Sequence, residues 1–224
     1  MRSALVILTF ASGCDRVFLT APDCLELLCA DFDTRATGED LFPTHYELDG
    51  TSTSVRGPAV SPPNSFNAEA EAGTVATYAV IQREVGKPGM HALIEFWAAA
   101  PQASVMCQPW AAYLRLDTNE PEDYQIQYRI GTDRVTTYVT TPSKTVMHET
   151  MVADTKEFHL VQLEVDVAKS IVIVAIDHGI PERIEGIDLS EAIVAQPEFQ
   201  IGIGLVPQHS ACSVLIDDVT IFAR

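Results

Sequence analysis

Apolar and polar residues alternate along several short segments of this chain, as in β-strands that bury one face. Residues 124–130 (YQIQYRI) and 161–167 (VQLEVDV) alternate without a break. Residues 171–176 (IVIVAI) are continuously apolar, which predicts a central strand buried on both faces. Further strand-like segments are 74–83, 92–98, 113–117, 134–140, 199–205 and 214–222.

Turn-forming residues separate these segments and indicate the fold class. Asp177, His178 and Gly179 predict a tight hairpin in which Gly179 takes a positive φ. Only residues 188–195 have a helical pattern, with Asp188 or Ser190 as the cap. Evenly spaced strands and turns predict an all-β protein, a two-sheet antiparallel sandwich of the jelly-roll kind. Other turn signals lie at 86–89, 119–121 and 141–143.

Composition excludes some partners. The chain has 224 residues, 47% of them hydrophobic and 20% charged, which is typical of a folded domain. Lysine and arginine total 14 against 31 acidic residues, so the formal net charge is −17. Phosphate contacts need clustered basic side chains, so no nucleic-acid partner is expected. Electrostatic binding to anionic lipid is excluded for the same reason.

The first residues have the pattern of an export signal. Arg2 precedes the apolar residues 4–10, a segment too short to span a bilayer. Residues 11–14 (ASGC) then resemble the lipobox of bacterial lipoproteins, in which the signal peptide is cut before a cysteine that carries lipid. Ala11 departs from that pattern, which usually has leucine there. A plain secretory signal and a buried strand remain alternatives.

The lipobox resemblance implies a domain organisation and a location. It implies a signal peptide at 1–13, lipidation of Cys14, and a short tether over 14–30 that leads into a β-sandwich domain at 31–224. The protein is then expected in the cell envelope, held to the membrane only through its lipid.

The remaining cysteines fit an exported protein. If Cys14 is acylated, four cysteines are left, and four allow three disulfide pairings. Cys24 and Cys29 are close enough in sequence to close a small loop, which leaves Cys107 to pair with Cys212. We therefore expect the disulfides Cys24–Cys29 and Cys107–Cys212.

Several segments, taken in order, resemble the concanavalin A-like lectin and laminin-G-like jelly rolls. Residues 158–179 resemble their penultimate hairpin and 214–221 their final strand. Residues 30–33 resemble the first strand, and 61–66 the loop before the next core strand. The resemblance implies a jelly roll but not one activity, because this fold hosts lectins, hydrolases, lyases and structural modules.

The same resemblance implies a structural Ca²⁺. In similar jelly rolls, acidic side chains of the first and last strands hold the ion, and the matching positions here are Asp33 and Asp217, with Asp31 and Asp218 beside them. Calcium prefers several oxygen ligands. The alternative is a β-bulge at Asp217–Asp218, because the apolar alternation changes parity there.

One polar face is a candidate sugar-binding surface. Trp97 shares strand parity with Glu95, so its ring is expected on a polar sheet surface, although aromatic residues are more often part of the core. Aromatic rings flanked by amides and guanidinium groups hold the apolar faces and hydroxyls of sugars. The candidate ligand-binding residues are Trp97, Tyr113, Arg115, Gln127 and Arg129, with Gln125 beside them.

Catalytic signatures are incomplete. Glu164 and Asp166 begin the Glu-x-Asp-x-x-Glu pattern of laminarinase-like enzymes, but Lys169 stands where the last glutamate should be. Residues 125–129 (QIQYR) are similar to the Gln-Ile-His strand of alginate-lyase-like enzymes, yet the histidine is missing. No Gly-x-Ser-x-Gly motif is present. The sequence therefore predicts no catalytic residues.

We expect a non-enzymatic recognition module at the envelope, with carbohydrate as its ligand. A structural or protein-interaction lipoprotein without a sugar site is the first alternative, and its partner would be an envelope protein. A polysaccharide-degrading glycosidase or lyase is the second.

Overall fold

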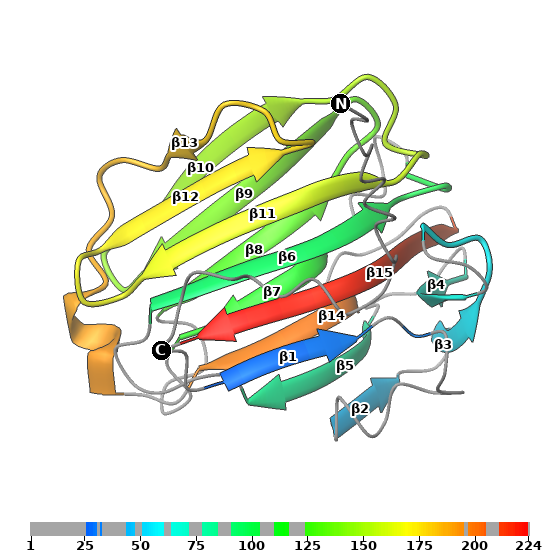
Figure 1. Ribbon diagram of the computed structural model, residues 1–224, viewed down its shortest axis with the longest axis horizontal. Coiled ribbons are helices and arrows are strands. Elements are labelled where there is room, and N and C mark those ends of the chain that lie inside the picture. Colours follow the sequence, from blue (N-terminus) through cyan, green and yellow to red (C-terminus); the bar gives the residue numbers. More distant parts are fainter. Residues whose placement is uncertain are drawn as a thin grey trace, which may run out of the picture.

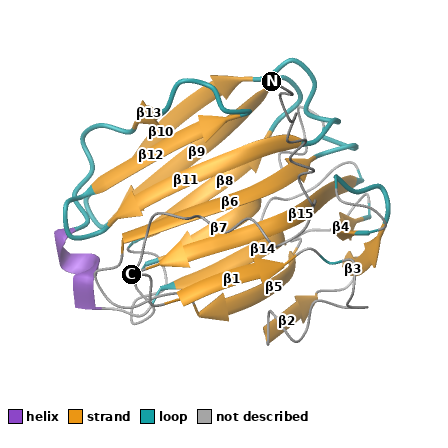
Figure 2. Cartoon of the chain, in the orientation of Figure 1, coloured by secondary structure: helices purple, strands orange, loops and turns teal. Residues whose placement is uncertain are grey.

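The structure is a computed structural model in which strands predominate (Figures 1 and 2). No helix in the described residues has the length and apolar character to cross a membrane. The structure describes residues 26–30, 32, 44–47, 51–60, 64–71, 78–84, 91–103, 110–116, 124–194, 197–204 and 211–223.

Two antiparallel sheets form the described part of the chain, and sheet A lies in front of sheet B in Figure 1. In sheet A, the last strand of the chain contacts three others: β15 pairs with β6 on one side, and with β4 and then β1 on the other. Sheet A contains, in order, β13 (Glu182–Arg183), β12 (Ile171–Ile176), β11 (His159–Asp166), β6 (His91–Ala99), β15 (Cys212–Ala223), β4 (Ser65–Ala70) and β3 (Thr51–Arg56), with β1 (Glu26–Ala30) beside β15.

Sheet B supplies the second layer. Its strands β7, β8, β9 and β10 are joined in sequence order as a meander, and β14 inserts between β7 and β5. Sheet B contains, in order, β10 (Lys144–Met151), β9 (Arg134–Thr141), β8 (Gln125–Ile130), β7 (Trp110–Arg115), β14 (Glu198–Gly204), β5 (Tyr78–Glu84) and β2 (Thr44–Glu47).

This architecture confirms the predicted all-β sandwich and changes some of its details. β1 begins at Glu26, inside the segment predicted as a tether. The prediction of a central strand at Ile171–Ile176 is wrong: β12 lies next to the two-residue edge strand β13, and the outward side chains Ile171 and Ile173 are only half-buried. Strand β10 was not predicted, because an exposed edge strand needs few apolar residues.

Aromatic side chains join the two sheets. The Phe96 ring from β6 lies edge-on to the Tyr128 ring from β8, with centroids 5.5 Å apart, and 6.3 Å from the Phe199 ring of β14. Phe96 and Phe199 are each 1% exposed. Burying one such side chain contributes about 1.5–3 kcal/mol to folding, so this cluster fixes one sheet on the other. At the other end, Phe32 packs on Phe66.

The turn after β12 is a hairpin, as predicted, but its left-handed residues differ from the prediction. Asp177 (φ 52°) and His178 (φ 57°) take positive φ, whereas Gly179 does not. Gly179 is needed for space: a Cβ there would lie 2.9 Å from the carbonyl oxygen of Ile176, which accepts the Gly179 N–H. The expected helix is a 3₁₀ helix, Ser190–Val194, and Asp188 caps it through the Ser190 N–H.

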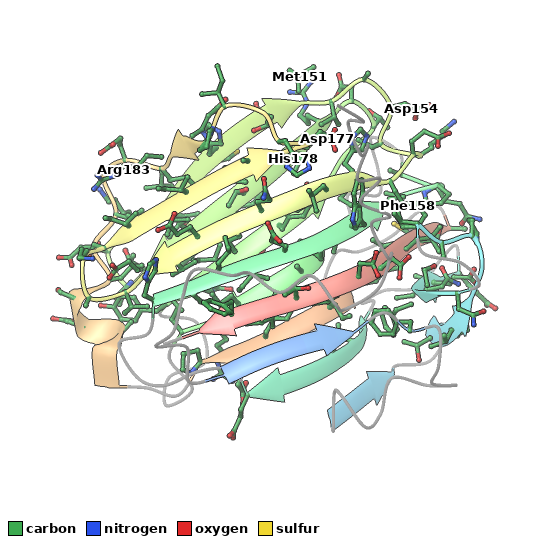
Figure 3. The ribbon with its side chains drawn as sticks, in the orientation of Figure 1. Met151, Asp154, Phe158, Asp177, His178 and Arg183 are labelled. Atoms are coloured by element: carbon green, nitrogen blue, oxygen red, sulfur yellow. The ribbon has the colours of Figure 1, made fainter. Side chains whose placement is uncertain are left out.

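His159 connects this turn to the loop that precedes β11. Its Nδ1 lies 2.7 Å from Asp177 Oδ2, and its Nε2 lies 2.7 Å from the Asp154 carbonyl oxygen. Asp177 Oδ1 also accepts the Leu160 N–H. Figure 3 shows Asp154, Asp177 and His178 at one end of the sandwich. Both ring nitrogens face acceptors, so only the protonated imidazole can donate to both.

This geometry predicts a pH-dependent contribution to stability. Burial lowers the pKa of His159, but the hydrogen bonds to Asp177 and Asp154 outweigh it, so the pKa is raised above its usual value. A raised folded-state pKa means that the stabilisation is complete below about pH 6.5, the pKa in the unfolded chain, and is lost as pH rises through the folded-state value. We expect the destabilisation by His159→Asn, measured by urea unfolding, to shrink as pH rises.

His178→Asn is the matched control, because His178 is exposed at the same turn. The difference in unfolding free energy between the two variants isolates the hydrogen-bonded imidazole of His159 from the turn that it contacts. A loss of unfolding free energy in His159→Asn that grows as pH rises would contradict the conclusion that the protonated imidazole of His159 stabilises the fold.

A second prediction concerns Tyr128. Its hydroxyl is buried, and no group in the described part of the chain lies within hydrogen-bond reach of it. Burial raises the pKa of this phenol far above its usual range, and the charge of Asp177 adds to the effect. An unsatisfied buried hydroxyl costs about 1–3 kcal/mol, so Tyr128→Phe should increase the free energy of unfolding by about 1 kcal/mol.

Tyr124→Phe is the matched control, and its expected change in the free energy of unfolding has the opposite sign. The Tyr124 hydroxyl donates to Glu191 Oε2 at 3.1 Å, so its removal should lower stability, by about 1 kcal/mol. A loss of stability in Tyr128→Phe would show that its hydroxyl has a partner.

Candidate functional site

The outer face of sheet B carries polar side chains in register across five strands. Antiparallel partners point to the same side of a sheet, so each ladder of partners gives a row on that face. Between these rows, the inward positions hold core residues such as Leu114, Ile126 and Phe199. We call the following residues the polar face: Gln82, Gln200, Tyr113, Gln127 and Tyr138 in one row, Glu84, Glu198, Arg115 and Gln125 in the next, and Arg129.

Gln127 is the hub of a hydrogen-bond network on β8. Its Oε1 accepts from Arg129 Nη2 at 2.8 Å and from Arg129 Nε at 3.2 Å. Its Nε2 donates to Gln125 Oε1 at 2.8 Å. The Arg129 guanidinium carbon also lies 4.6 Å from the centroid of the Tyr138 ring. These contacts fix the orientation of the guanidinium group before any ligand arrives.

A second amide pair lies on β14 and β5. Gln200 Nε2 donates to Gln82 Oε1 at 2.5 Å, and Gln200 is only 5% exposed although it points to the outer side of the sheet. Gln200 is the register partner of Tyr113, so the amide pair continues the row that Gln127 and Tyr138 begin.

Arg115, Glu84 and Glu198 form a charged group at one end of the polar face, opposite the end that carries Arg129. Arg115 Nη1 lies 3.7 Å from Glu198 Oε2, with both side chains mostly buried. Burial raises the pKa of Glu198, Arg115 opposes that shift, and the carboxylate of Glu84 adds to it, with a raised pKa as the net result. Glu84 and Glu198 are direct register partners on neighbouring strands.

The structure brings together four of the five predicted ligand-binding residues and separates the fifth. Tyr113, Arg115, Gln127 and Arg129 share the polar face. Trp97 points to the outer side of its sheet, as the strand parity predicted, and is partly buried. The expectation that it neighbours the other four is wrong, because β6 belongs to sheet A.

The surroundings of Trp97 explain this separation. Its register partners are Leu160 on β11 and Asp217 on β15, both of sheet A. The outer face of sheet A points away from sheet B, so Trp97 and the polar face lie on opposite sides of the sandwich (Figure 1).

Sequence reasoning missed several members of the polar face. Tyr138 and Gln200 each occupy an outward position within a predicted strand. Alternation alone could have placed them outside the core. It could not show that β14 inserts beside β7, which is what brings Gln200 next to Tyr113.

Asp217, a predicted calcium ligand, is fully buried in a bulge of β15. Its Oδ2 accepts the Val60 N–H at 2.8 Å and its Oδ1 accepts the Asp218 N–H at 2.9 Å. The adjacent pairing of β1 with β15 agrees with the expected neighbourhood of the first and last strands. Asp33 lies outside the described residues, which contain no cluster of three potential metal ligands. Calcium therefore stays a prediction.

The signal peptide, the lipidation of Cys14 and the disulfide pairings also stay predictions. Cys14, Cys24 and Cys107 lie outside the described residues, as does the predicted signal peptide. Cys212 is buried at the start of β15 and is disulfide-bonded, to a cysteine whose side chain is not described. The pairing of Cys107 with Cys212 stays a prediction, as does that of Cys24 with Cys29.

Comparison with known proteins identifies the fold. No family model matches the chain, and no curated protein matches it. Among solved structures, the cellulose induced protein Cip1 is similar, with a TM-score of 0.60 at 10% identity, over 86% of this chain and 95% of that one. Alginate lyase of polysaccharide lyase family 7 is similar with a TM-score of 0.57 at 8% identity, over 87% of this chain and 93% of that one.

A toxin domain has the same architecture. Botulinum neurotoxin type C, described as entering cells through interaction with two ganglioside molecules, matches with a TM-score of 0.52 at 12% identity. The match covers 77% of this chain but only 43% of the neurotoxin chain. At such low identities these likenesses show the fold alone, and the chain is a jelly-roll sandwich of the concanavalin A-like type.

Proposed function

We propose that this domain is a non-enzymatic recognition module that binds carbohydrate on the polar face of sheet B. The observation that carries the proposal is the grid of amide, guanidinium and phenol groups that the register places across β5, β14, β7, β8 and β9. Sugars present hydroxyls that both donate and accept hydrogen bonds, and glutamine amides complement both roles.

The rigidity of the face supports the same proposal. Arg129 is held by Gln127 and Tyr138, and Gln200 is held by Gln82. Binding groups that are already ordered lose little conformational entropy when a ligand arrives. The rings of Tyr113 and Tyr138 provide apolar surface between the amides for the carbon faces of a sugar.

The structural neighbours add support at the level of the fold. One is described as interacting with gangliosides and another as a polysaccharide lyase, so this sandwich serves proteins that act on glycans. The location at the cell envelope, through a lipid on Cys14, is part of the proposal and comes from the N-terminal sequence pattern.

A glycan array with the full-length protein tests the proposal. We expect binding to one glycan class, and a loss of at least about tenfold in affinity in Gln127→Ala, because that change removes the acceptor of Arg129 and a ligand-facing amide. Trp97→Phe is the matched control on the opposite face and should leave affinity unchanged. If Gln127→Ala keeps its affinity for the glycan and Trp97→Phe loses affinity, the site lies on sheet A instead.

One observation favours polysaccharide hydrolysis as a second candidate. Glu84 and Glu198 oppose each other on the polar face, and the pKa of Glu198 is raised, as a general acid requires. An assay for new reducing ends on the glycan that the protein binds decides between the two. New reducing ends that form with the wild-type protein but not with Glu198→Gln would establish the enzyme. A glycan that stays intact with the wild-type protein supports the binding module.

A further inference from the structure

Arg129 stands apart from the other arginines in its charge partners. Arg115, Arg134 and Arg183 each form an ion pair with a carboxylate. Among the arginines whose side chains the structure describes, Arg129 alone has no carboxylate partner. This is unexpected in a chain with 31 acidic and only 14 basic residues, where carboxylates are abundant.

The neighbours of Arg129 that the structure describes carry no charge, and its register partner on β7 is Trp110. Its neighbours are the Gln127 amide and the Tyr138 ring on the polar face, and its register partner on β9 is Thr136. On the same row, the acidic residue is Glu149 of β10, which is two strands and so about 10 Å away. Glu149 itself lies 3.5 Å from Arg134 Nη1.

The guanidinium group also has spare donors. Arginine carries five N–H groups, and in Arg129 the Nε–H and one Nη2–H go to Gln127 Oε1. The remaining three have no acceptor among the described residues. A half-buried guanidinium group with fixed orientation, open donors and no carboxylate partner among the described residues has the chemistry to bind an anion that accepts two hydrogen bonds side by side.

We propose that the glycan bound by the polar face is anionic, and that Arg129 binds its carboxylate or sulfate group. This inference rests on the proposed carbohydrate-binding function and specifies its ligand class. Gln127 and Tyr138 act as positioning residues, because they hold the guanidinium group in one orientation and leave three of its five N–H groups for a ligand. The neutral amide of Gln82, which is partly exposed, then contacts the uncharged part of the sugar chain, and the buried amide of Gln200 holds it in place.

The test uses the full-length protein and matched polysaccharides. Glucan, mannan and xylan chains are each compared with derivatives that carry a carboxylate or a sulfate on the same backbone, by calorimetric titration. We expect one of the anionic derivatives to bind at least about tenfold more tightly than its neutral parent, as charge-assisted pairs to arginine allow. The carboxylate and sulfate arms distinguish the two possible anions.

Arg129→Gln and Arg134→Gln each remove one positive charge, and comparing them makes the test specific. Arg129→Gln should remove the preference, so that the anionic derivative and its neutral parent bind this variant with affinities within about threefold of each other. Arg129→Lys, which keeps the charge but loses the planar pair of donors, should retain part of the preference. Arg134→Gln, on the neighbouring strand and already paired with Asp133, should change neither.

The outcomes separate the two proposals. Equal binding of neutral and anionic chains, or equal effects of Arg129→Gln and Arg134→Gln, overturns the inference and leaves the carbohydrate-binding function standing. Failure of the folded protein to bind any chain, neutral or anionic, overturns the proposed function and the inference with it.

Discussion

The contact between the two sheets determines the rest of this structure. Phe96 from sheet A packs on Tyr128 and Phe199 from sheet B, and all three side chains are inward positions of their strands. Successive residues of a strand point to opposite faces, so fixing these three inward fixes every neighbour outward. A shift of one residue in β8 would move Gln127 and Arg129 into the core. The aromatic cluster therefore determines which residues form the polar face as well as which residues form the core.

The two outer faces that result are chemically different. On sheet A, outward positions include Leu160 and Leu215, both nearly buried, and the polar residues form local pairs such as Gln162 with Glu95. On sheet B, amides and a guanidinium group form a connected network over several strands. An ordered network in which the Arg129 guanidinium group keeps donors open is suited to binding, whereas the paired groups on sheet A mainly stabilise that sheet.

The sequence predicted most strands from β5 onwards, missed β2, β3 and β10, and did not indicate the spatial order of the strands. Alternation identified Gln125, Gln127 and Arg129 as outward residues, because this period is a local property of the chain. Trp97 was assigned correctly to an outer face, but the choice of sheet depends on pairing with β11 and β15, which lie far away in sequence. Strand β10 escaped prediction because its residues are exposed and carry little alternation.

The site was predictable only in part for the same reason. The pairing of Gln200 with Gln82 joins residues 118 positions apart, and no local pattern indicates it. The missing counter-ion of Arg129 is likewise a property of the assembled sheet. Asp217 illustrates the converse: its chemistry suggested a metal ligand, whereas the fold uses its carboxylate to accept the Val60 and Asp218 N–H groups.

The central claim is that the polar face of sheet B, and not sheet A, meets the ligand. The most direct measurement is an NMR titration of the full-length protein with the glycan that binds best, following the side-chain amide signals of glutamine and the separately assigned indole signals of the two tryptophans. We predict that the amides of Gln127 and Gln200 shift on binding while the indole of Trp97 and the amide of Gln162 stay in place. Shifts confined to Trp97 and Gln162 would contradict the account.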